Sequence, residues 1–141
     1  MVIAGHSLGA MTALAMAYNT CCVDRRVDAV VSIAGQLATF PGGVWNTGTV
    51  PVLFVHGRAD QTVAYTGSGE AFQEVGTSAY LLTVEAGDHG GYLGGDDDHY
   101  PAVRDSVLAF LLSTVGDQPR AGLSDLAVAG GSAGIRLTTR G

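Results

Sequence analysis

The chain has 141 residues, of which 47% are hydrophobic, so its size and composition are those of one ordinary folded domain. A formal net charge of -6 argues against binding to the phosphate backbone of nucleic acids. No apolar run approaches the roughly 18 residues of a membrane-spanning helix. No basic and then apolar leader precedes the first strand-like run. We therefore expect no nucleic-acid partner, no membrane contact and no export signal in this chain.

Four short apolar runs, each ending in glycine or directly followed by it, are predicted to be strands: residues 1–4, 27–35, 50–57 and 79–87. The second and third runs are nearly continuous in Val, Ile, Leu and Phe. Such runs are typical of strands buried on both faces of a parallel sheet.

Helical patterns lie between these runs. Residues 8–19 are apolar on nearly every side, which predicts a buried helix. Residues 67–75 form a shorter helical pattern with Ser68 as a candidate N-cap, and residues 100–116 show amphipathic periodicity. The alternation predicts an α/β fold, with about four parallel strands and flanking helices.

Two segments fall outside this alternation. The connector at 36–49 is too short for a cap domain. Composition changes after Gly116, so we divide the chain into a domain at 1–116 and a loose tail or weak extra hairpin at 117–141.

The chain has two cysteines, Cys21 and Cys22, which are adjacent. This spacing fits neither a disulfide framework nor a Cys-x-x-Cys site. We interpret them as a buried pair without a disulfide near a helix end, with a partner cysteine outside this chain as the alternative.

The segment GHSLG carries the chemistry that the sequence indicates most directly. It follows a strand-like run and opens a helix, which is the strand-turn-helix setting of a nucleophile elbow. Ser7 would be the nucleophile, and Gly5 and Gly9 would leave room for the sharp turn. The backbone N–H of Leu8, at the helix N-terminus, would face a developing oxyanion.

A serine nucleophile needs a base and an acid, in the chain order Ser, Asp, His in this kind of fold. Asp60 follows the third strand-like run and His89 the fourth, so both lie at the strand ends that Ser7 shares. Asp88 is the competing acid, but neighbours in sequence rarely point at one another. His56 lies in a predicted buried strand and is interpreted as structural.

Other residues are weaker candidates. His6 should point away from the base and could contact substrate, as could Gln36 and Trp45 from the connector; Phe40 is a further candidate for an acyl pocket. His99 follows three aspartates, whose spacing matches no established metal loop, so we interpret that segment as solvated and predict no metal site.

The motifs GHSLGA, PVLFVHGRADQTV and EAGDHGGY make residues 1–116 resemble the α/β-hydrolase superfamily, particularly its capless serine esterases and its dienelactone-hydrolase-like and polyester-hydrolase-like members. The resemblance implies Ser7 as nucleophile, His89 as base and then acid, and Asp60 as the residue that holds the imidazole. Dienelactone hydrolases use cysteine where this chain has Ser7, which favours simple esters as substrates.

The same resemblance implies that only the C-terminal half of the fold is represented. In that family the serine strand is the fifth of eight, so the spatial order would be 5-6-7-8 with the first run as an exposed edge. The loop that supplies the second oxyanion donor would be absent. We expect a loss of about a hundredfold to a thousandfold in turnover from that absence.

The sequence thus predicts a serine hydrolase of small or polymeric carboxylic esters, working through an acyl-enzyme without a cofactor. A peptidase or acyl transferase would use the same three residues. A non-catalytic fragment is the alternative from a different class.

Overall fold

A single sheet organises the computed structural model, which describes residues 1–46, 48–76, 78–116, 125–127 and 129–141. The sheet order is β1-β2-β3-β4-β5. The strands are Val2–His6 (β1), Ala29–Ile33 (β2), Val52–Gly57 (β3), Ala79–Val84 (β4) and Ile135–Arg140 (β5). Strands β1 to β4 are parallel and adjacent in chain order, which confirms the predicted α/β class and places β1 at one edge.

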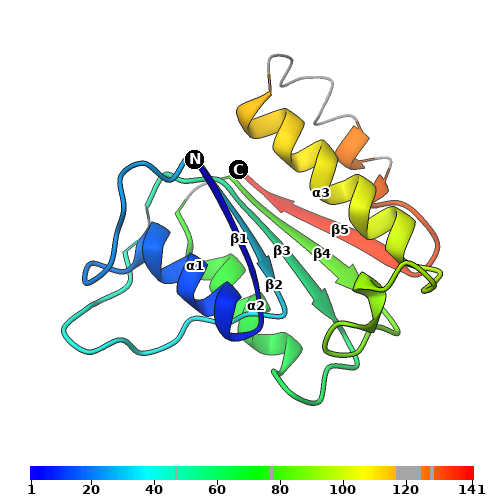
Figure 1. Ribbon diagram of the computed structural model, residues 1–141, viewed down its shortest axis with the longest axis horizontal. Helices are drawn as coiled ribbons and strands as arrows, with labels where there is room; N and C mark the ends of the chain where they lie inside the picture. The colour runs from blue at the N-terminus through cyan, green and yellow to red at the C-terminus, as the bar shows by residue number, and fades with distance from the viewer. Residues whose placement is uncertain (47, 77, 117–124, 128) are drawn as a thin grey trace.

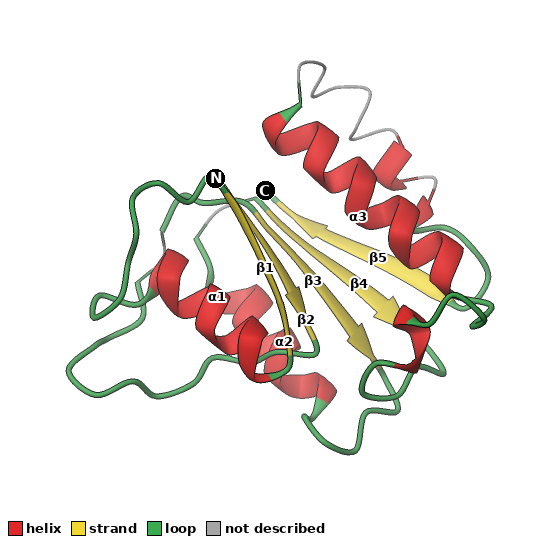
Figure 2. Ribbon diagram, in the orientation of Figure 1, coloured by secondary structure: helices red, strands yellow, loops and turns green. Residues whose placement is uncertain are grey.

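Helices cover both faces of the sheet. They are Leu8–Tyr18 (α1), Tyr65–Glu74 (α2), Tyr100–Val115 (α3) and a short 3-10 helix at Gly91–Leu93 (η1). Figure 1 shows α1 and α2 on one face and α3 on the other, and Figure 2 separates the helices from the central strands. Among the described residues, no helix is both long and apolar enough to cross a membrane.

The core divides in two because successive strand residues point to opposite faces. Val30 and Phe54 pack with α1 and α2, whereas Val31 and Leu53 pack with α3. All four side chains are at most 2% exposed. The continuous apolar runs are thus explained by burial of both faces, as the sequence predicts.

Two local predictions for the helices are wrong. Helix α2 begins at Tyr65, and Ala64 occupies the N-cap position without a side-chain hydrogen bond. Ser68 is not a cap: it is fully buried inside the helix, where its hydroxyl has partners from other elements. Helix α1 is not buried all round, since Leu8 at its start is 72% exposed.

The last strand departs from the expectation of a loose tail or weak hairpin. Residues 135–140 form β5, which pairs antiparallel with β4. Ile135 and Leu137 alternate with polar residues and add to the core beneath α3, so one face of β5 is held by the hydrophobic effect. Residues 117–124 lie outside the described residues, and the division of the chain at Gly116 stays a prediction.

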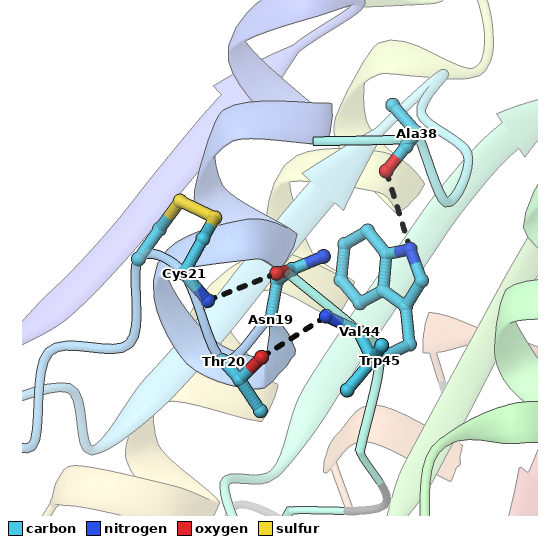
Figure 3. Close-up of a disulfide and its surroundings, with 7 residues drawn as sticks. Asn19, Thr20, Cys21, Ala38, Val44 and Trp45 are labelled. Atoms are coloured by element: carbon cyan, nitrogen blue, oxygen red, sulfur yellow. Dashed lines mark hydrogen bonds between the residues drawn. A yellow bond between two sulfur atoms is a disulfide. The ribbon is translucent and has the colours of Figure 1, made fainter. Parts of the chain in front are cut away.

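The prediction for the cysteines is also wrong. Cys21 and Cys22 are bonded to each other and exposed, in the turn after α1. Figure 3 shows how this turn meets the connector: the Asn19 side chain accepts the Cys21 N–H, and Asn19 also forms a β-bridge with Trp45. The Trp45 indole N–H donates to the Ala38 carbonyl at 3.2 Å. The turn and the connector therefore support one another.

Helix α3 provides a direct test of the core. Phe110 is fully buried and its ring meets the Tyr80 ring edge-on at 5.7 Å, whereas Leu112 on the same helix is 53% exposed. We expect Phe110→Ala to lower the free energy of unfolding by about 3–5 kcal/mol. Leu112→Ala should change it by about 0.5 kcal/mol or less. Chemical denaturation of both variants measures the difference, and equal losses would contradict the assigned core.

Candidate active site

The turn at Ser7 joins β1 to α1. Ser7 has a positive φ of 56°, a conformation that costs a non-glycine residue on the order of 1 kcal/mol. The Ser7 N–H donates to the Ile33 carbonyl at 2.9 Å, which ties the turn to β2. Leu8 is the first residue of α1, so its N–H belongs to the helix-end amides that lack partners within the helix. The chain therefore makes a sharp strand-turn-helix at Ser7, the local shape that the sequence predicts.

The two glycines of the turn differ in what they do. A Cβ on Gly5 would lie 2.2 Å from the carbonyl carbon of Gly9, so no side chain fits at Gly5. A Cβ on Gly9 would meet nothing within 4 Å. The close approach of strand and helix therefore explains Gly5, and the expectation that Gly9 also supplies space is wrong for this chain.

Asp60 is a buried carboxylate in the loop after β3. Its Oδ1 accepts the N–H groups of Thr62 and Val63 at 2.8 and 2.9 Å. Its Oδ2 accepts His89 Nδ1–H at 2.8 Å and lies 3.1 Å from His56 Nε2. Burial alone would raise the pKa of Asp60, but hydrogen bonds from His89 and the two amides outweigh burial and hold it at about 2.

His89 connects the acid to the serine. Its Nδ1 lies 2.8 Å from Asp60 Oδ2, and its Nε2 lies 2.9 Å from Ser7 Oγ. The imidazole side chain is 25% exposed while the Asp60 side chain is 0% exposed. The structure thus brings together Ser7, His89 and Asp60, from three separate strand ends, in one hydrogen-bonded line. A base held by an acid beside a serine hydroxyl can activate that hydroxyl as a nucleophile.

The loop after β4 has to cross the end of β3 to reach the serine. Gly57, the last residue of β3, permits this crossing because a Cβ there would lie 2.3 Å from the carbonyl oxygens of Gly87 and Asp88. The Ala59 N–H donates to the Gly87 carbonyl at 2.9 Å and holds the loop in place. The glycine after His56 is therefore a requirement of the site's geometry.

His6 does not point away from the base as expected. Its ring centroid lies 4.7 Å from that of His89, and its Nε2 is hydrogen-bonded to the His89 backbone carbonyl. The fold brings the loop after β4 against the end of β1, and the sequence of the turn does not reveal this neighbour. His6 thus contacts the backbone of the residue whose ring faces Ser7.

Asp88 and His56 have roles that differ from one another. Asp88 is exposed, and its Oδ1 accepts the N–H groups of Gly90 and Gly91; these hydrogen bonds lower the pKa of Asp88. Asp88 therefore shapes the turn, whereas Asp60 contacts His89.

His56 is buried and contacts the same Asp60 oxygen as His89 does, a contact that sequence reasoning missed. The four-residue spacing of His56 and Asp60 was the available signal.

The connector residues lie apart from the triad. Gln36 and Trp45 line a cleft with residues of α2, and the triad residues are not part of its lining. The rings of Phe40 and Trp45 meet edge-on at 6.3 Å. A role in substrate binding remains a prediction for Gln36 and Trp45.

The acidic segment before α3 holds a histidine of its own. His99 Nδ1 lies 3.0 Å from Asp97 Oδ1, and this pair is partly exposed. Within the part of the chain that the structure describes, no group of three or more His, Cys, Asp or Glu side chains could hold a metal ion.

The fold and the turn define the class of the protein. A parallel sheet covered on both faces, with a serine elbow after one strand and acid and histidine after later strands, is the architecture of the α/β-hydrolases. A family model described as TAP-like protein matches residues 10–124, and the chain belongs to this α/β-hydrolase family. The match begins after Ser7.

A solved structure supports the fold assignment. The crystal structure of esterase PE8 is similar with a TM-score of 0.56 and 20% identity, over 81% of this chain and 50% of that chain. At this identity the likeness shows the fold, and the present chain spans about half the length of that esterase. No curated protein matches the chain in sequence.

The elbow can be tested by filling its close contact. Gly5→Ala would place a Cβ against the Gly9 backbone, so we expect the free energy of unfolding to fall by about 2 kcal/mol or more. Gly69→Ala is the matched control, because a Cβ at Gly69 in α2 meets nothing within 4 Å. It should raise stability by about 0.5–1 kcal/mol. Chemical denaturation decides, and a Gly5→Ala variant as stable as the parent would contradict the assigned contact.

The buried carboxylate predicts a specific acid sensitivity. The folded pKa of Asp60 is about 2, below the value of about 3.9 in an unfolded chain. Its contribution to stability is therefore complete above about pH 4 and is lost as the pH falls toward 2. Unfolding measured across this range should show a shallower pH dependence in Asp60→Asn than in the parent. Asp98→Asn, at an exposed site, should keep the parent's slope.

Proposed function

We propose that this chain carries the nucleophile, base and acid of a serine hydrolase that cleaves carboxylic esters through an acyl-enzyme. The observation that carries the proposal is the unbroken line of contacts from Ser7 Oγ to His89 Nε2, at 2.9 Å, and from His89 Nδ1 to Asp60 Oδ2, at 2.8 Å. Both distances are within hydrogen-bond reach for a base and its orienting acid.

The chemistry follows from this order of contacts. Ser7 Oγ attacks the ester carbonyl carbon while His89 Nε2 takes the hydroxyl proton. The Leu8 N–H stabilises the oxyanion of the tetrahedral intermediate. The alcohol then leaves with the proton from His89, and a water activated by the same nitrogen releases the acid. These steps use no metal or organic cofactor.

Asp60 supports each proton transfer without itself taking the proton. With a pKa of about 2 it is ionised at neutral pH, so it accepts from His89 Nδ1–H. That hydrogen bond leaves the lone pair of Nε2 directed at Ser7. The charge of Asp60 also favours the imidazolium that forms when His89 takes the serine proton.

The substrate in this proposal is a small or polymeric carboxylic ester. His6 is proposed to contact it, because its ring lies beside that of His89. Gln36 and Trp45 belong to a separate cleft, where they would meet a longer substrate. A peptidase or acyl transferase would use the same three residues, so the choice of acyl acceptor and leaving group is decided by assay.

A fluorophosphonate probe, which phosphonylates an activated serine hydroxyl, tests the proposal on the 141-residue chain. We expect one adduct, located at Ser7 by mass spectrometry. Ser7→Ala should abolish it, and His89→Ala should reduce its rate by about a thousandfold or more. A p-nitrophenyl ester and a p-nitroanilide assayed in parallel separate esterase from peptidase activity.

The matched control is His99→Ala. His99 is paired with Asp97 as His89 is with Asp60, but among the described residues it has no hydrogen bond to a serine. It should leave labelling of Ser7 unchanged. A chain that is folded by circular dichroism yet shows no adduct at Ser7 would contradict the proposal and favour a non-catalytic fragment.

A further inference from the structure

His56 contacts the acid of the proposed triad at the same carboxylate oxygen as His89 does. It belongs to β3 and its side chain is 0% exposed. Its Nε2 lies 3.1 Å from Asp60 Oδ2 and 3.0 Å from the Val63 carbonyl oxygen. Its Nδ1 lies 2.7 Å from Ser68 Oγ, on α2. Both ring nitrogens are therefore engaged, and one of them shares an oxygen with the base.

The partners determine which nitrogen carries the proton. The Asp60 carboxylate and the Val63 carbonyl can only accept, so Nε2 must donate. Burial lowers the pKa of His56 more than its contacts with Val63 and Asp60 raise it. Asp60 Oδ2 and the Val63 carbonyl oxygen therefore share the Nε2 proton.

Ser68 ties this histidine to a third element. Its hydroxyl donates its single proton to the Gly35 carbonyl at 2.8 Å, just after β2, and its oxygen lies 2.7 Å from His56 Nδ1. The Tyr65 ring meets the His56 ring edge-on at 5.7 Å, while its hydroxyl is paired with Thr83 Oγ1 at 2.7 Å. His56 is thus held by a hydroxyl from α2 and a ring contact, so its position is set independently of Asp60.

We propose that His56 is a positioning residue for the reaction, which fixes Asp60 Oδ2 so that this oxygen meets His89 Nδ1. The proposal rests on the proposed function. A purely structural histidine would need partners but would have no reason to donate to the oxygen that orients the base. With His56 in place, Oδ2 has donors on two sides and Oδ1 has two amide donors, so the carboxylate cannot turn without breaking a hydrogen bond.

Two substitutions separate the donor from the bulk of the ring. In His56→Gln the side-chain amide N–H can replace Nε2–H toward Asp60. His56→Leu retains bulk but has no donor. We expect fluorophosphonate labelling of Ser7 to fall by about tenfold or more in His56→Leu and to stay within about threefold in His56→Gln. His99→Leu controls for the loss of a histidine elsewhere.

Nuclear magnetic resonance of the full chain gives a readout that requires no activity. With 15N-labelled histidine, His56 should carry a proton on Nε2 at about pH 7. With 13C-labelled aspartate, the pKa of Asp60 should rise above its value of about 2 in His56→Leu, since a donor to the charged form is lost, and rise less in His56→Gln.

The outcomes distinguish this inference from the proposed function. If the parent is not labelled at Ser7, the proposed function fails, and the tautomer and the Asp60 titration alone decide whether His56 positions Asp60. A parent His56 that lacks a proton on Nε2 overturns the inference, even if His56→Leu fails to fold. Equal labelling rates, or equal pKa values of Asp60, in folded Leu and Gln variants also overturn it.

Discussion

The parallel pairing of β1, β2, β3 and β4 is the constraint on which the site depends, because it places the carboxyl ends of these strands at one edge of the sheet. Ser7, Asp60 and His89 each follow one of these ends. Neighbouring strands lie about 4.8 Å apart, so His89 meets Ser7 only if its loop returns across β3. Gly57 makes that return possible, since any side chain there would occupy the space of the loop backbone.

The Asp60 carboxylate is buried at the same edge, and two separate sets of hydrogen bonds stabilise its charged form. The amides of Thr62 and Val63 belong to the Asp60 loop itself, so their hydrogen bonds form with the turn. The imidazoles of His56 and His89 come from β3 and from the loop after β4. The amides therefore favour ionisation whatever the histidines do, whereas the direction in which Oδ2 points depends on the two rings.

The sequence predicts those features that arise from local pattern: four buried parallel strands, the turn around Ser7, and the strand ends that carry Asp60 and His89. It does not predict β5. The alternation in Ile135–Arg140 is compatible with a half-buried strand, but it does not indicate the partner strand, β4, which is far away in the chain. The contacts of His6 and His56 were also missed. His6 contacts a loop that the fold brings alongside, and spacing along the chain does not encode such a neighbour, whereas His56 and Asp60 are four residues apart.

The three residues of the triad do not receive equal support from the sheet. Asp60 and His89 follow β3 and β4, which have a paired strand on both sides, and β5 supplies the second neighbour of β4. Ser7 follows β1, the edge strand, whose pairing among the described residues is with β2. The hydrogen bond from the Ser7 N–H to the Ile33 carbonyl therefore ties the proposed nucleophile to β2, beside the strands that carry the proposed acid and base.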